Sequence, residues 1–70
     1  MTWNQLHPDH KLLAENTLTR KQLDIYKLHL AGCGTRRIAL MLDISQSTAR
    51  THLARAHQKL AIALDRRTAA

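Results

Sequence analysis

Four side chains that can recognise DNA bases lie within the six residues from Gln46 to Thr51. They are Gln46, Ser47, Arg50 and Thr51, in the stretch "LDISQSTARTHLARAHQKL" that runs from Leu42 to Leu60. A glutamine amide can pair with adenine, an arginine fork can donate two hydrogen bonds to guanine, and hydroxyls adapt to bases or phosphates. These residue types therefore predict the reading of base edges in a DNA groove.

An apolar stripe is expected to hold these side chains outward on one helix. The stripe is spaced four, three, four and three residues apart, which keeps one side of an α-helix buried: Ala49, Leu53, Ala56, Leu60 and Ala63. Ser45 is a good N-cap, and the pattern predicts a helix from there to about Leu64. Ser47, Thr51 and Arg55 then lie on the polar side of the helix, opposite the stripe. Gln46 and Arg50 lie on the flank of that polar side.

Other residues are predicted to contact phosphates: Thr35, Arg36, Arg37, Arg55 and Lys59. Arg36 and Arg37 stand in the first turn of an expected helix, where cations oppose the helix dipole by a few tenths of a kcal/mol each. A phosphate at that helix end would attract both the arginines and the free backbone N–H groups. Arg55 and Lys59 lie where the last helix would leave the groove toward the sugar-phosphate wall.

Arg20 and Lys21 occupy a similar position in the first turn of the preceding helix. They are a weaker indication of the same kind.

The elements that must position these residues are all helical, because no strand-like alternation persists. We expect a short helix at about Pro8 to Glu15, then one from a Thr19 and Gln22 capping box to about Ala31. A helix at 35–42 and a tight turn at 43–45 lead into the last helix. Small Ala39 at the helix crossing and apolar Ile44 in the turn are typical of a helix-turn-helix.

The predicted fold class is therefore an all-α bundle of three to four helices, with a possible additional N-terminal helix and a long C-terminal recognition helix. We divide the chain into an N-terminal segment at 1–17, the helix-turn-helix domain at 18–64 and a basic tail at 65–70.

Composition suits a domain that binds a polyanion. The 70 residues are enough for one domain, and 11 Lys and Arg against 5 Asp and Glu give a net charge of +6. The single cysteine excludes an internal disulfide and fits a reducing compartment. No apolar run approaches the roughly 18 residues of a membrane span, and no signal-peptide pattern is present. The expected location is the cytoplasm, at the nucleoid, without membrane association.

Neither catalysis nor a cofactor is expected, since no Ser, His and carboxylate set, glycine-rich phosphate loop or paired carboxylates stand out. His29 and Cys33 have the spacing of a metal pair but lack a third ligand, so no metal site is predicted. His52 is expected to be a packed, hydrogen-bonded residue at the core edge rather than a base reader.

Leu40 projects away from the predicted buried side of its helix. We expect the N-terminal segment, with Trp3 and Leu6, to cover it, the alternatives being a lone exposed residue or a seat for a partner.

From Leu18 to Leu60 the chain resembles the LuxR-type (GerE-like) DNA-binding domain and, nearly as well, the promoter-reading C-terminal domain of sigma factors. The matching positions run without a gap and are Leu18, Thr19, Ile25, Leu28, Gly32, Ile38, Ala39, Leu42, Ile44, Ser45, Thr48, His52, Lys59 and Leu60. The resemblance implies a helix-turn-helix within a four-helix unit, with the helix from Gln46 in the major groove. It also implies that Arg50 stands where the family usually contacts a base.

The chain departs from this family in three places. Gly34 and Arg37 stand where the family commonly has a Ser and a Glu that form a capping box, so the helix start is expected to be weaker. Ala49 and Ala56 replace larger aliphatics, which predicts a thinner core or one filled by the N-terminal segment. The family's fourth helix, often its dimer surface, is reduced to the tail "DRRTAA".

The expected function is a sequence-specific DNA-binding transcription regulator of bacterial or phage type, with double-stranded DNA as its partner. One alternative is a sigma-factor-like module that binds RNA polymerase or a sigma factor rather than reading DNA. Another is a DNA-architecture factor for excision or packaging. A homodimer is left open.

Overall fold

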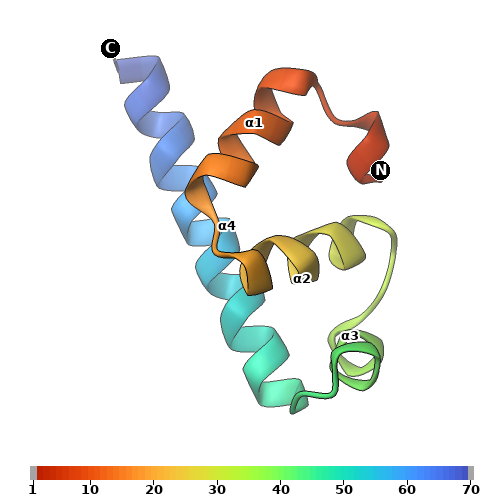
Figure 1. Cartoon of the computed structure of the whole chain (residues 1–70). Coiled ribbons are helices and arrows are strands. Elements are labelled where there is room, and N and C mark those ends of the chain that lie inside the picture. The colour runs from red at the N-terminus through yellow and green to blue at the C-terminus, as the bar shows by residue number, and fades with distance from the viewer. Residues whose placement is uncertain (1, 70) are drawn as a thin grey trace.

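Four α-helices, preceded by one short turn of 3₁₀ helix, form a small all-α bundle (Figure 1). A computed structural model of the chain describes residues 2–69 and the side chains of residues 2–66. The elements are η1 (Trp3–Gln5), α1 (Pro8–Thr17), α2 (Arg20–Leu30), α3 (Thr35–Leu42) and α4 (Gln46–Ala69). The predicted fold class is confirmed.

Local signals in the sequence explain where the helices begin and end. Pro8 occupies the first turn of α1, and Thr19 caps α2, where its Oγ1 accepts from the Gln22 amide at 3.2 Å. After α2 the chain reverses at Gly32, whose φ of +98° is a conformation that favours glycine. Gly34 offers no side chain to cap α3, in agreement with the missing capping box.

The turn between α3 and α4 is the tight connection of a helix-turn-helix. Asp43 ends α3 in the left-handed region, with φ 55° and ψ 49°, and the Ile44 amide then donates to the Ala39 carbonyl at 3.0 Å. Aspartate is one of the few residues with a side chain that occasionally adopts this conformation. The half-buried Ile44 packs against the core between α3 and α4, as expected.

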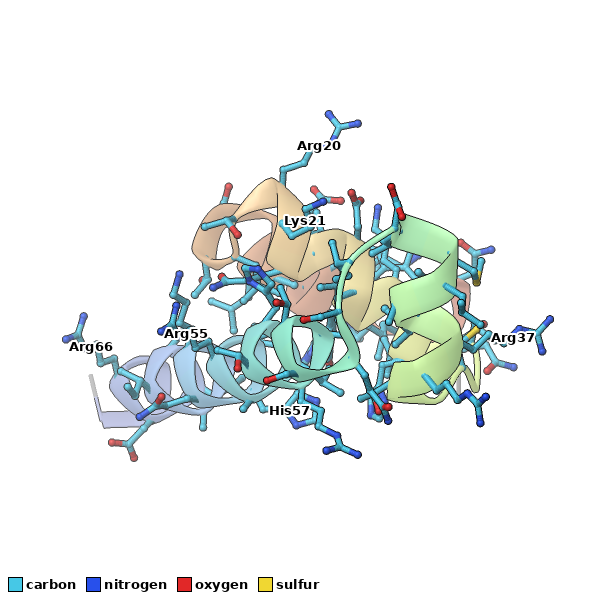
Figure 2. The ribbon with its side chains drawn as sticks, turned by 90° about the horizontal axis from the view of Figure 1, so that it is seen from below. Arg20, Lys21, Arg37, Arg55, His57 and Arg66 are labelled. Carbon is cyan, nitrogen blue, oxygen red and sulfur yellow. The ribbon has the colours of Figure 1, made fainter. Side chains whose placement is uncertain are left out.

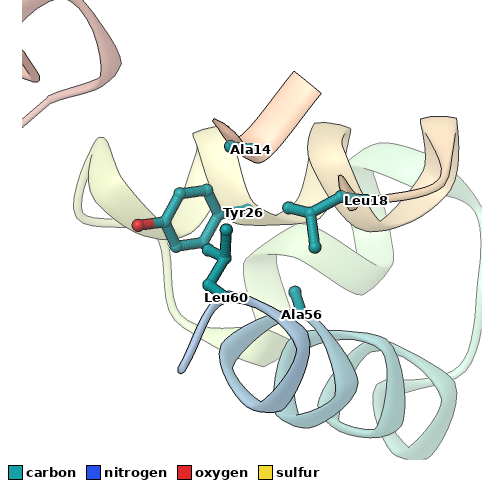
Figure 3. Close-up of a cluster of buried hydrophobic side chains, with 5 residues drawn as sticks. All are labelled: Ala14, Leu18, Tyr26, Ala56 and Leu60. Atoms are coloured by element: carbon teal, nitrogen blue, oxygen red, sulfur yellow. The ribbon is translucent and has the colours of Figure 1, made fainter. Parts of the chain in front are cut away.

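Two adjoining hydrophobic clusters hold the bundle together. One joins α2, α3 and α4 through four buried residues: Ile25, Ile38, Ala39 and Ala49. The other joins α1, α2 and α4 through five, shown in Figure 3: Ala14, Leu18, Tyr26, Ala56 and Leu60. Because α4 contributes to both clusters, its apolar stripe is the axis on which the other helices pack.

The N-terminal segment fills the space beside the small residue Ala56. Ala14 of α1 is fully buried in the same cluster, and Trp3 and Leu6 pack against it from outside. Of the two alternatives expected at Ala49 and Ala56, filling by the N-terminal segment therefore holds at Ala56, whereas no described residue of that segment is in the cluster of Ala49.

A polar contact ties the start of α2 to the middle of α4. Gln22 is only 5 % exposed, and its Oε1 accepts from the Thr19 amide at 3.2 Å and from Lys59 Nζ at 2.9 Å. Gln22 thus serves both as a helix cap and as the acceptor for a lysine from another helix. A buried amide with these partners avoids the cost of an unsatisfied polar group.

Rings from α1 and α4 pack around Tyr26 of α2 at the edge of the second cluster. Its hydroxyl is 3.2 Å from His10 Nε2 of α1, and the His57 ring of α4 packs edge-on against it with centroids 5.9 Å apart. Burial raises the pKa of the Tyr26 phenol above its ordinary value, so the phenol stays neutral at physiological pH. These contacts join α1 to the rest of the bundle.

The structure corrects two expectations. Leu40 is 77 % exposed and is not covered by the N-terminal segment, because Trp3 and Leu6 pack on the cluster around Ala14 instead. The predicted helix end near Leu64 is also wrong, since α4 continues through Ala69. Residues 61–69 contain neither Gly nor Pro, so nothing in that stretch stops the helix.

We predict that Ala49→Leu destabilises the fold, because Ala49 is fully buried between Ile38 and Ile25 and a larger side chain would separate the helices. Overpacking of this kind typically lowers the free energy of unfolding by about 1–3 kcal/mol. Ala54→Leu, at an exposed position of the same helix, is the control and should change it by less than about 0.5 kcal/mol. Urea denaturation measures both, and equal losses would contradict the predicted close packing.

Candidate nucleic-acid interface

The amino end of α4 is exposed and well capped. Ser45, Gln46, Ser47 and Thr48 are all exposed, whereas Ala49 is fully buried. Ser45 Oγ accepts from the Thr48 amide at 3.0 Å and donates to Thr48 Oγ1 at 2.7 Å. The cap therefore fixes the first turn of α4 while leaving its outer side open to a ligand.

All four predicted base-reading residues lie on the exposed side of α4. Arg50 has no side-chain hydrogen bond or ion pair to any described residue, and Thr51 Oγ1 donates to the Ser47 carbonyl at 3.0 Å. That bond runs back along the helix and leaves the hydroxyl oxygen able to accept. The geometry thus presents one guanidinium and two hydroxyls on a rigid helix, away from the core.

One predicted base reader touches one predicted phosphate contact. Gln46 Nε2 of α4 donates to Thr35 Oγ1 of α3 at 3.3 Å. This leaves one Gln46 N–H and its Oε1 free, which is the donor and acceptor pair that adenine requires. The hydrogen bond also sets the starts of α3 and α4 side by side, and no pattern in the sequence indicates this contact.

The three arginines predicted to contact phosphates are free to do so. Arg36 and Arg37 start α3, Arg55 stands on α4, and all are exposed and without a side-chain partner among the described residues. The first turn of α3 contains no acidic residue, so its two cations remain uncompensated. Figure 2 shows Arg37 projecting from α3, and Arg55 on α4 at a distance from it.

Lys59 differs from the three arginines predicted to contact phosphates. It is half-buried, and its ammonium already donates to Gln22 Oε1 at 2.9 Å. The structure thus gives it a role in joining α2 to α4, which sequence reasoning missed because the two residues lie 37 positions apart.

His52 is half-buried, as expected of a residue at the core edge, but the expected hydrogen bond is not made at its Nδ1. This nitrogen is a buried atom with no partner in the described part of the chain.

Two other features are absent from the described residues, a cluster of metal ligands and a helix that could span a membrane. No three histidine, cysteine or acidic side chains are grouped as a metal ion would require. Among the same residues, no helix combines the length and apolar character needed to cross a bilayer.

Comparison with protein families agrees with this geometry. The family model described as "Bacterial regulatory proteins, luxR family" matches residues 16–69, which include α2, α3 and the whole of α4. The chain belongs to the LuxR family of bacterial regulatory proteins. No curated protein and no solved structure matches it.

Domains of the LuxR family are DNA-binding domains of transcription regulators. The family is a regulatory and not an enzymatic one. In this chain the helix-turn-helix is formed by α3, the turn at 43–45 and α4. No separate helix follows α4 among the described residues, since α4 itself extends to Ala69.

We predict that Ser45→Ala lowers the free energy of unfolding of this LuxR-family domain by about 1 kcal/mol, because it removes the oxygen that accepts from the Thr48 amide. Ser47→Ala, two residues further along and without a capping bond, is the control and should be nearly neutral. Thermal unfolding followed by circular dichroism measures both. Equal stability of the two variants would show that the cap contributes nothing.

Proposed function

We propose that this domain is a sequence-specific transcription regulator that inserts the amino half of α4 into the DNA major groove. Gln46, Ser47, Arg50 and Thr51 read base edges, while Thr35, Arg36, Arg37 and Arg55 hold phosphates. Lys59 is left out of the set because its ammonium is engaged by Gln22.

The observation that carries the proposal is the division of α4 into two sides. Ala49, Ala56 and Leu60 are buried, whereas the polar residues on the opposite side are exposed. A major groove is about 12 Å wide and admits one helix, so an outward-facing polar side on a single capped helix suits it. The net charge of +6 supplies the attraction to DNA that does not depend on sequence.

We predict different effects for two arginine substitutions. Arg50→Ala should relax discrimination at one base pair by about 1–3 kcal/mol, because it removes a fork that donates to a base edge. Arg36→Ala should weaken binding to all sequences alike and reduce the slope of log affinity against log salt by about 1, because it removes a phosphate contact. Both side chains are exposed and unpaired among the described residues, so neither change should alter folding.

The measurement begins with selection of a preferred site from a random duplex pool by the wild-type chain. Affinity for that site and for a scrambled duplex is then titrated at several salt concentrations for both variants. Equal loss on both duplexes for both variants would disprove the division between base and phosphate contacts. A wild-type chain that enriches no sequence would disprove sequence-specific function altogether.

A second candidate, a module that binds RNA polymerase or a sigma factor, is favoured by one observation on α3. Leu40 and Met41 are 77 % and 56 % exposed, and they are consecutive residues of α3. An exposed apolar pair can seat a protein partner. Capture of purified polymerase or sigma factor by an Arg50→Ala, Arg55→Ala double variant, abolished by Leu40→Ser, would support this candidate.

A further inference from the structure

Three cations on the side of α4 away from α3 have no role in the fold. We propose that Arg20 and Lys21 of α2, together with Arg55 of α4, contact the DNA strand across the major groove from the strand reached by Arg36 and Arg37. The inference rests on the proposed insertion of α4 into the groove and adds how the two strands are held.

Two hydrogen bonds place the starts of α2 and α3 on different sides of α4. Gln46 donates to Thr35, the first residue of α3, at 3.3 Å, and Lys59 donates to Gln22, in the first turn of α2, at 2.9 Å. At 100° per residue, Gln46 and Lys59 point about 220° apart around the axis of α4 when counted across its exposed side, and the buried stripe occupies the remaining arc of about 140°. The exposed reading side lies between these two directions, so each flank of that side has one helix start beside it.

Arg55 belongs to the flank of α2. It precedes Lys59 by one helical turn and therefore lies on the same side of α4. Figure 2 shows Lys21 and Arg20 at α2 on one side of α4, with Arg55 on α4 itself, whereas Arg37 projects beyond α3. The cations thus form two groups, one on each flank of the reading helix.

The three cations are not neutralised within the protein. Each is exposed, and none makes a side-chain hydrogen bond or ion pair among the described residues. Asp24 lies one helical turn from Arg20 and Lys21 but pairs with neither, and it lines a shallow depression beside Met41 and Leu42 of α3. Arg20 and Lys21 also oppose the dipole of α2, whose first turn has no acidic residue.

The shape of the duplex then assigns the strands. A helix in the major groove has one sugar-phosphate backbone on each side of it, and cations positioned on both flanks meet phosphates of different strands. Because the group at α3 faces one backbone, the group at α2 faces the other. The group formed by Arg20, Lys21 and Arg55 is defined by side-chain charge on two helices and does not depend on the backbone amides at the start of α2.

The test uses three variants. They are the α2 double variant that combines Arg20→Gln and Lys21→Gln, the single variant Arg55→Gln, and the α3 double variant that combines Arg36→Gln and Arg37→Gln. Arg66→Gln is the matched control, because Arg66 is exposed and lies within about 20° of Arg55 around α4 but about 16 Å further along the helix. Each protein is examined on the selected duplex by phosphate ethylation interference with either strand labelled, and by the dependence of affinity on salt.

We expect the α2 double variant and Arg55→Gln to lose interference signals on one strand and the α3 double variant to lose them on the other. Each double variant should reduce the salt slope by roughly 2 and Arg55→Gln by roughly 1, with no change for Arg66→Gln. The melting temperature should not fall in either double variant, because each change removes cations that oppose a helix dipole.

Loss of signals from the same strand in both double variants would overturn the strand assignment. So would an unchanged salt slope in the α2 double variant, or an equal reduction in Arg66→Gln. If the wild-type chain binds duplexes without sequence preference, the proposed function fails while the salt slopes on random DNA still decide whether the α2 group contacts phosphates. A chain that binds no duplex overturns both proposals.

Discussion

The close approach of α3 and α4 is the constraint on which the interface depends. Ala39 and Ala49 meet in one buried cluster with Ile25 and Ile38, and their small side chains allow the two helices to cross at short distance. With its apolar side committed to that contact, α4 has only its polar side left to present. The orientation of every residue proposed to read DNA follows from this packing, and none of them needs a loop to position it.

Polar contacts between helices then determine where the cations stand. The bond from Gln46 to Thr35 holds the start of α3 beside the start of α4. The bond from Lys59 to the buried Gln22 holds the start of α2 on the other flank of the exposed side of α4. A surface hydrogen bond adds little to stability, but Gln22 is buried and would be costly to leave unsatisfied. The position of α2 relative to the reading helix is therefore well specified.

Helix positions and the buried stripe of α4 were predictable because each has a local cause. Thr19, Gly32 and Ser45 mark helix ends, and the spacing of Ala49, Ala56 and Leu60 marks the buried side. Contacts between distant segments were not predictable in this way. Nothing in the sequence indicated that Trp3 would pack beside Ala14 and leave Leu40 exposed, since the N-terminal segment could have covered either apolar site. Lys59 likewise looked like a free cation until the fold placed Gln22 beside it.

Ala56 of α4 explains why the N-terminal segment packs against the rest of the bundle. Ala56 leaves space beside Leu60 and Tyr26, and Ala14 of α1 fills it, while Trp3 and Leu6 cover the outside. Lys27 of α2 stands over the Trp3 ring at 4.7 Å, which adds a cation–π contact to the same attachment. A small helical domain has little apolar area to spare, so a segment that buries Ala14 in the same cluster as Ala56 contributes to the stability of α4 itself. The segment thus supports the reading helix from the side opposite to its proposed DNA contacts.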